Sequence, residues 1–148
     1  MPVSIDDIYK QKSQIEANSF IPKEAYNRLL ISRGYYASFS YACEIVDNKK
    51  NGINLIRKDK YKSYGSHECY YESLMQCNYD KLTEVGAKLK RYHHLRKIAD
   101  YKLKKHVTDA DLDRANQYLE ECKELMDSFV QSKLNSSLTL NASTIATP

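Results

Sequence analysis

Apolar residues recur along most of the chain at spacings of three and four residues, which is the period of an α-helix. The clearest row consists of Val85, Leu89, Tyr92, Arg96, Ala99 and Leu103. A second row consists of Ala115, Tyr118, Cys122, Leu125 and Phe129, with Leu112, Leu119 and Met126 beside it. No segment alternates strictly between apolar and polar residues, and the chain has only 4 glycines and 3 prolines. The pattern therefore predicts an all-α fold.

Capping residues divide this pattern into five helices. Ser4 and Thr108 are suitable N-caps, each followed by aspartates in the first turn, and Pro22 suits the first turn of a helix. The predicted helices begin at about residues 4, 22, 67, 79 and 108 and end at about residues 18, 48, 77, 105 and 134. The core face predicted for the second helix consists of Ala25, Leu29, Tyr36, Phe39, Cys43 and Val46.

The remaining stretches lack this periodicity. Residues 49–66 contain Asn51-Gly52 and Gly65, which are turn signals, and are predicted to form a linker. Residues 135–148 are rich in Ser and Thr and carry no charge, and we predict that they form a disordered tail. Residues 1–134 would then form one all-helical domain.

Two arginines interrupt the predicted apolar faces. Arg96 lies in the row described above, and Arg33 lies in a row with Tyr26, Leu29 and Tyr36. A guanidinium is always charged and is seldom buried without a partner. Asp100, one helical turn after Arg96, could be that partner. Two interpretations stay open, a structural Arg–Asp pair and a polar site inside the bundle that holds an anion.

Charge is distributed unevenly around a net charge of +4. Segment 49–62 carries six basic residues and one acid, segment 84–106 eight basic residues and two acids, and segment 109–127 seven acids and two basic residues. Tyrosines are interleaved with the basic residues, a composition typical of surfaces that contact phosphates and stacked bases. The alternative is a solvated basic face that pairs with the acidic fifth helix, within the chain or across a dimer.

Composition excludes some classes of protein. No apolar run approaches the roughly 20 residues that a membrane span needs, and the N-terminus shows no secretory signal, so we expect a cytoplasmic protein without membrane contact. The four cysteines form no CxxC pair, and we expect them to be reduced. His67, Cys69 and Cys77 lack a fourth ligand at zinc-site spacing, so no metal or other cofactor is predicted.

Two motifs carry a family resemblance. Arg33-Gly-Tyr-Tyr-Ala-Ser-Phe39 and Leu95-Arg-Lys-Ile-Ala-Asp-Tyr101, with His67 between them, resemble the HEPN domain, in particular the small prokaryotic HEPN proteins with an Arg-x-x-Ala-Asp-Tyr signature. The resemblance covers roughly residues 5–132. It implies a four- to five-helix up-and-down bundle that is usually a homodimer. Many such domains are metal-independent ribonucleases of toxin–antitoxin, CRISPR-associated and other phage-defence systems.

The resemblance also implies a catalytic pair, an Arg followed by a polar residue, here Lys97, and four to six residues after that a His. An Arg can neutralise charge on the phosphoryl oxygens, and a His can move a proton near neutral pH. In this chain the expected His position falls at Tyr101, Lys102 or Leu103, so the pair is incomplete. The candidate catalytic residues are therefore Arg96 and Asp100 with His67 or His93. The candidate binding residues are Arg33, Tyr101, Lys58, Lys60 and Lys62.

Four hypotheses follow from these residues. The first is an RNA-cleaving toxin that uses a non-standard acid or base. The second is a catalytically silent HEPN domain that binds RNA or a nucleotide. The third is a module that binds a protein partner, such as a nucleotidyltransferase-type antitoxin or a defence-complex subunit. The fourth is a helical adaptor whose arginines are structural.

Overall fold

The computed structural model describes residues 4–16, 20–57 and 65–144, and these residues contain helices and no strand. The helices are α1 (Ile5–Glu16), α2 (Lys23–Asp47), α3 (Ser66–Met75), α4 (Asp80–Tyr101) and α5 (Asp109–Thr144), with a short 3-10 helix η1 (Lys49–Asn51) after α2. The all-α prediction is confirmed, and each predicted helix is present.

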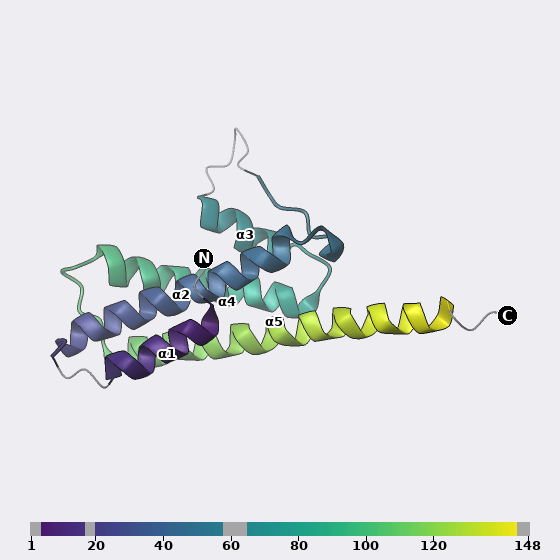
Figure 1. Cartoon of the computed structure of the whole chain (residues 1–148). Coiled ribbons are helices and arrows are strands. Elements are labelled where there is room, and N and C mark those ends of the chain that lie inside the picture. Colours follow the sequence, from purple (N-terminus) through teal and green to yellow (C-terminus); the bar gives the residue numbers. More distant parts are fainter. Residues whose placement is uncertain (1–3, 17–19, 58–64, 145–148) are drawn as a thin grey trace.

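The long helices alternate in direction, as Figure 1 shows, with α1 and α4 running opposite to α2 and α5. Helices α2, α4 and α5 pack against one another, α3 packs against α4 and α2, and α1 packs against α2. The largest fully buried side chains lie where these helices meet, and they include Ile31, Tyr35, Leu74, Leu82, Leu89, Tyr92 and Met126. The protein is therefore an up-and-down helical bundle with one core.

Both predicted N-caps are confirmed. The Ser4 hydroxyl accepts a hydrogen bond from the Asp7 backbone N–H at 3.1 Å, and the Asp7 carboxylate accepts one from the Ser4 N–H at 3.1 Å. Thr108 and Asp111 make the same reciprocal pair at 3.2 and 3.0 Å. Each pair satisfies two N–H groups that the first helical turn would otherwise leave without a partner.

Helix α4 ends at Tyr101, four residues earlier than predicted, because a side chain from α2 binds its last carbonyls. The Arg28 guanidinium donates to the carbonyl oxygen of Ile98 at 3.3 Å, to that of Ala99 at 2.9 Å, and to that of Lys105 in the following turn. These bonds satisfy acceptors that a helix end leaves free. Leu103 therefore lies beyond the helix and is exposed, contrary to its predicted place on the core face.

The predicted core faces of α4 and α5 are otherwise confirmed. The predicted face of α2 is confirmed only in part, because Val46 is buried and Phe39 packs against the core but other members are exposed. Ala25 and Arg33 are exposed, and Tyr36 keeps 41% of its surface exposed. Helix α2 packs against four other helices, so its buried positions are not confined to one stripe. Several of them are small, including Gly34, Ala37, Ser38 and Ala42. A row chosen by its large apolar residues misses such positions.

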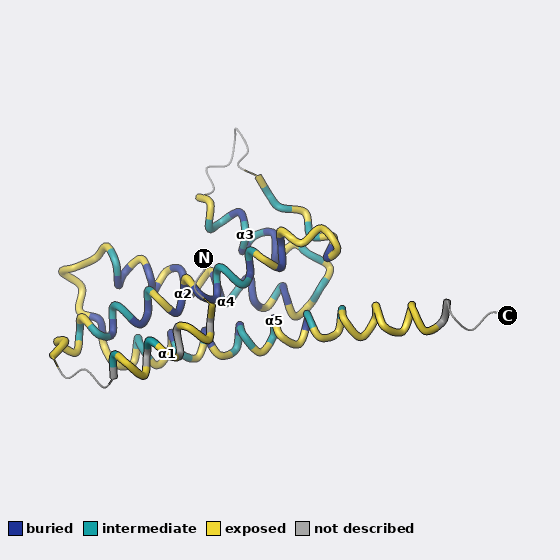
Figure 2. The backbone as a smooth tube through the Cα atoms, viewed as in Figure 1, coloured by how far each residue is buried: buried dark blue, intermediate teal, exposed yellow. Residues whose placement is uncertain are grey.

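The disordered tail is also a wrong prediction for residues 135–144, because α5 continues to Thr144. No glycine or proline interrupts this stretch. The hydroxyls of Ser136, Ser137 and Thr139 each donate to the carbonyl oxygen four residues earlier. These polar side chains are therefore satisfied without interrupting the helix. This part of α5 extends past the other helices (Figure 1), and Figure 2 shows it almost entirely exposed.

Two further predictions concern the linker and the membrane. Residues 52–57 have no regular secondary structure, whereas Lys58, Lys60 and Lys62 lie outside the described residues. Among the helices that the structure describes, none combines the length and the apolar character needed to cross a bilayer.

Candidate functional site

Arg96 of α4 is the centre of the candidate site. Its side chain is 8% exposed, and its Nε lies 2.6 Å from Oδ2 of Asp100, so the predicted Arg–Asp pair is confirmed. The Ser32 hydroxyl of α2 donates to the same carboxylate at 3.2 Å. The Nε–H does not point at that oxygen and makes no hydrogen bond, so the contact with Asp100 is ionic. This pair is local to α4 and is tied to α2.

Two tyrosines enclose the guanidinium. Its carbon lies 4.8 Å from the ring centroid of Tyr36 and 4.9 Å from that of Tyr101, and Nη2 donates to both hydroxyls, with a distance of 2.9 Å to Tyr101. Burial alone would lower the pKa of Arg96, but the Asp100 charge and the two tyrosines outweigh it and raise the pKa. Arg96 is therefore a fixed cation whose outer side is covered by phenol rings.

Two histidines from different helices meet beside this arginine. The rings of His67, at the start of α3, and His93, in the middle of α4, stack with centroids 4.9 Å apart and planes inclined by 22°. The Tyr35 hydroxyl is hydrogen-bonded to Nδ1 of His67 at 2.8 Å, and the Tyr35 ring stacks on His93 at 5.3 Å. Phe39 covers His67 from the other side, with ring centroids 4.2 Å apart. We call Tyr35, His67, His93 and Arg96 the His–Arg cluster.

Burial sets the charge of the cluster. It lowers the pKa of His67, and the Arg96 charge lowers it further. Burial lowers the pKa of His93 to about 4, with contributions from His67, Lys97 and Arg96. Burial also raises the pKa of Tyr35 well above its usual value. At neutral pH the cluster therefore holds two neutral imidazoles, a protonated phenol and one guanidinium cation.

These groups can remove a proton from a substrate and stabilise the negative charge that results, but they do not include a proton donor. A neutral, half-buried imidazole such as His67 can accept a proton from a hydroxyl, and Arg96 can stabilise negative charge that develops beside it. His93 is 9% exposed, and its low pKa makes it a poor proton donor at neutral pH. One copy of the cluster thus offers a base and a cation.

The predicted site residues fall into three groups. The structure brings together Arg96, Asp100, His67, His93 and Tyr101, all candidates from the sequence. Arg33 is exposed and makes no ion pair or hydrogen bond with Arg96 in the described part of the chain, so its predicted place on the core face is wrong. Lys58, Lys60 and Lys62 lie outside the described residues.

The two successive tyrosines of α2 contribute to the site in a way that was not predicted from the sequence. Tyr35 is fully buried against the histidines, whereas Tyr36 is partly exposed and binds Arg96. Adjacent helical residues point about 100° apart, so the pair can reach both halves of the site at once. The Tyr-Tyr dipeptide within the first motif was the available signal. Tyr101 occupies the first position at which the HEPN resemblance expects a histidine, and its hydroxyl binds Arg96.

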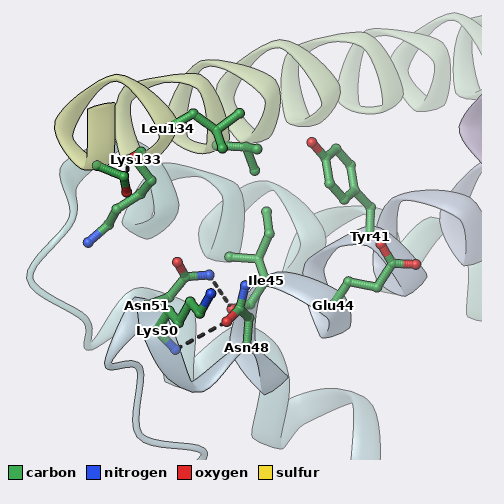
Figure 3. Close-up of a pocket in the computed structure, with 10 residues that line it drawn as sticks. Tyr41, Glu44, Ile45, Asn48, Lys50, Asn51, Lys133 and Leu134 are labelled. Atoms are coloured by element: carbon green, nitrogen blue, oxygen red, sulfur yellow. Dashed lines mark hydrogen bonds between the residues drawn. The ribbon is translucent and has the colours of Figure 1, made fainter. Parts of the chain in front are cut away.

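A separate pocket lies between the end of α2, η1 and α5 (Figure 3). Its walls combine apolar and polar side chains, including Tyr41, Ile45, Asn51, Lys133 and Leu134. The Asn51 side chain closes the base by donating to the Ile45 carbonyl oxygen at 2.8 Å. Among the predicted site residues that the structure describes, none lines this pocket.

Elsewhere, no group of three His, Cys, Asp or Glu side chains among the described residues is arranged to hold a metal ion. Comparison of the chain with protein-family models, with curated proteins and with solved structures gave no match. The function is therefore inferred from the geometry of the site and from the motifs at residues 33–39 and 95–101.

Proposed function

We propose that this protein is a HEPN-like, RNA-directed protein of a prokaryotic toxin–antitoxin or phage-defence system, and that the His–Arg cluster is its reaction site for metal-independent RNA cleavage. The observation that carries the proposal is the meeting of His67, His93 and Arg96. His67 of α3 lies far in sequence from His93 and Arg96, which are one turn apart on α4, and the three side chains converge beside the two-tyrosine motif of α2.

The proposed reaction begins with His67. The neutral imidazole removes the proton from the ribose 2′-hydroxyl, whose oxygen attacks the adjacent phosphorus, forms a 2′,3′-cyclic phosphate and expels the 5′-oxygen. Arg96 stabilises the charge on the phosphoryl oxygens during the attack. The leaving 5′-oxygen takes a proton from water, and the His67 imidazolium gives the proton that it removed back to the solvent, while His93 stays neutral. Homodimer formation belongs to the same proposal.

The test is cleavage of total RNA by purified protein in the presence of EDTA. We expect wild type to produce fragments ending in 2′,3′-cyclic phosphate and His67→Ala to lose the activity. His106→Ala is the matched control, because His106 is exposed, follows the end of α4 and lies outside the cluster. Arg96→Lys keeps the charge but loses the planar fork, so it should lower kcat while retaining the fold. Intact RNA with wild type, or equal activity of His67→Ala and His106→Ala, would reject the reaction.

A specific observation supports a second candidate, a silent HEPN-like module that binds a protein such as a nucleotidyltransferase-type antitoxin. Tyr36 and Tyr101 flank Arg96 with 41% and 68% of their surfaces accessible, and Leu103, two residues after Tyr101, is 76% exposed. Exposed aromatic residues beside an arginine are typical anchors of protein interfaces. Under this hypothesis the double variant Tyr101→Ala/Leu103→Ala loses the dimer or the partner complex in sedimentation while its helix content is unchanged.

A further inference from the structure

A groove of about 590 Å³ lies between α3, α4 and the start of α5, beside the His–Arg cluster. Its volume lies within the range of ligand sites in proteins. Four cationic side chains line it: Lys90, Arg91 and Lys97 of α4 and Arg114 of α5. Glu68 is the carboxylate among its described lining residues, so the groove is strongly positive.

Three of these four cations have no carboxylate within ion-pair distance among the described residues. Lys90 is paired with Glu72 at 3.0 Å. Arg91, Lys97 and Arg114 are exposed and form no ion pair with any residue that the structure describes. By contrast, nearby Lys88 on the same helix pairs with both Glu84 and Glu121. The acidic α5 thus neutralises one side of α4 and leaves the groove side charged.

The shape of the groove suits a strand rather than a single ion. Lys90, His94 and Lys97 follow one another at spacings of four and three residues, which places them along one face of α4 over about 10 Å. That length is enough for more than one phosphate of a nucleic-acid strand. Tyr118 is half-buried in the wall and offers an aromatic ring beside the cations, a combination used for stacking unpaired bases.

The groove also leads to the His–Arg cluster. His93 belongs to both, because it lines the groove and stacks on His67 at 4.9 Å. We propose that the groove binds single-stranded RNA, with Arg91, Lys97 and Arg114 contacting successive phosphates and the strand running towards His93. This inference rests on the proposed function, since it names the path by which RNA reaches the cluster.

The test measures binding separately from cleavage. The probe is a short, fluorescein-labelled single strand with 2′-O-methyl groups, which cannot be cleaved through its 2′-oxygens. Anisotropy titrations compare wild type with the groove variant Arg91→Glu/Lys97→Glu/Arg114→Glu. The control variant, Lys102→Glu/Lys104→Glu/Lys105→Glu, carries the same change of net charge on exposed residues after α4. Circular dichroism checks that both variants keep the wild-type helix content.

We expect the groove variant to bind at least about tenfold more weakly than the control variant. Its plot of log affinity against log salt, between about 50 and 200 mM, should be shallower than that of wild type by about 2, because three phosphate contacts are lost. Equal affinities of the two variants, or no binding of the probe by wild type, would overturn the inference.

A parallel assay on unmodified RNA separates the two proposals. Probe binding that depends on the groove, together with no cleavage by wild type, would support the groove and reject the reaction. Cleavage by the groove variant at the wild-type kcat/KM would reject the groove and leave the reaction standing.

Discussion

Replacing Arg96 by alanine should destabilise the bundle strongly, because the arginine is buried and its partners stay behind. The substitution removes a cation that is 8% exposed and leaves Asp100, whose side chain is 23% exposed, with the Ser32 hydroxyl as its remaining partner. Breaking a buried ion pair in this way typically costs 3–5 kcal/mol. Asp100 is partly hydrated, so the lower end of that range applies. The guanidinium also leaves two tyrosine rings, each contact being worth roughly 0.5–1 kcal/mol.

We therefore expect Arg96→Ala to lower the free energy of unfolding by about 4–5 kcal/mol. Urea denaturation followed by circular dichroism measures this difference when the transitions are two-state. For a chain of this length the melting temperature should fall by roughly 8–20 °C. Arg91→Ala is the matched control on the same helix, since Arg91 is exposed, and its effect should stay within about 0.5 kcal/mol.

The reasoning is refuted if Arg96→Ala and Arg91→Ala destabilise the protein equally. Arg96→Lys refines the test, because lysine keeps the charge near Asp100 but cannot donate to both phenol hydroxyls from a planar fork. A loss intermediate between those of wild type and Arg96→Ala is expected. A loss as large as that of alanine would mean that the tyrosine contacts, rather than the charge, stabilise this part of the bundle.

Three other predictions test different parts of the fold. Gly86→Ala should cost about 2 kcal/mol in urea denaturation, although alanine favours helices, because its Cβ would lie 2.7 Å from the Tyr71 carbonyl oxygen of α3. The pKa of His93 is lowered to about 4 in the folded protein, so stability should be full above pH 6.5 and decline towards pH 4 with a slope approaching 1.4 kcal/mol per pH unit; His93→Phe should flatten that decline. Truncation after Asn135 should change the melting temperature by less than about 2 °C, because the removed turns of α5 are exposed.

Local features of the site could be predicted from the sequence. Arg96 and Asp100 are one helical turn apart, so their contact follows from the helix alone. The buried face of α4 was equally predictable, because large apolar residues mark it from Val85 to Ala99. The N-caps at Ser4 and Thr108 are also local, since each involves residues three apart.

Features that depend on how helices cross could not be predicted in this way. The stacking of His67 on His93 requires α3 to pack on α4 at one register, which no spacing within either helix specifies. The same holds for Arg28, whose bonds to the end of α4 stop that helix four residues before its predicted end. Helix α2 lies among several neighbours, so its buried positions follow the whole packing arrangement rather than a single apolar stripe.

The arrangement around Arg96 also indicates what must move before the cation can meet a phosphate. Its Nη2 donates to the phenols of Tyr36 and Tyr101, which are neutral acceptors, and a phosphate oxygen is a stronger acceptor than either. Tyr101 is the last residue of α4 and is 68% exposed, so little packing opposes its displacement. Tyr36 lies in the middle of α2, and its ring also contacts those of Tyr35 and His67. We therefore infer that Tyr101 is the residue a phosphate would replace, while Asp100 and Tyr36 keep the guanidinium in place.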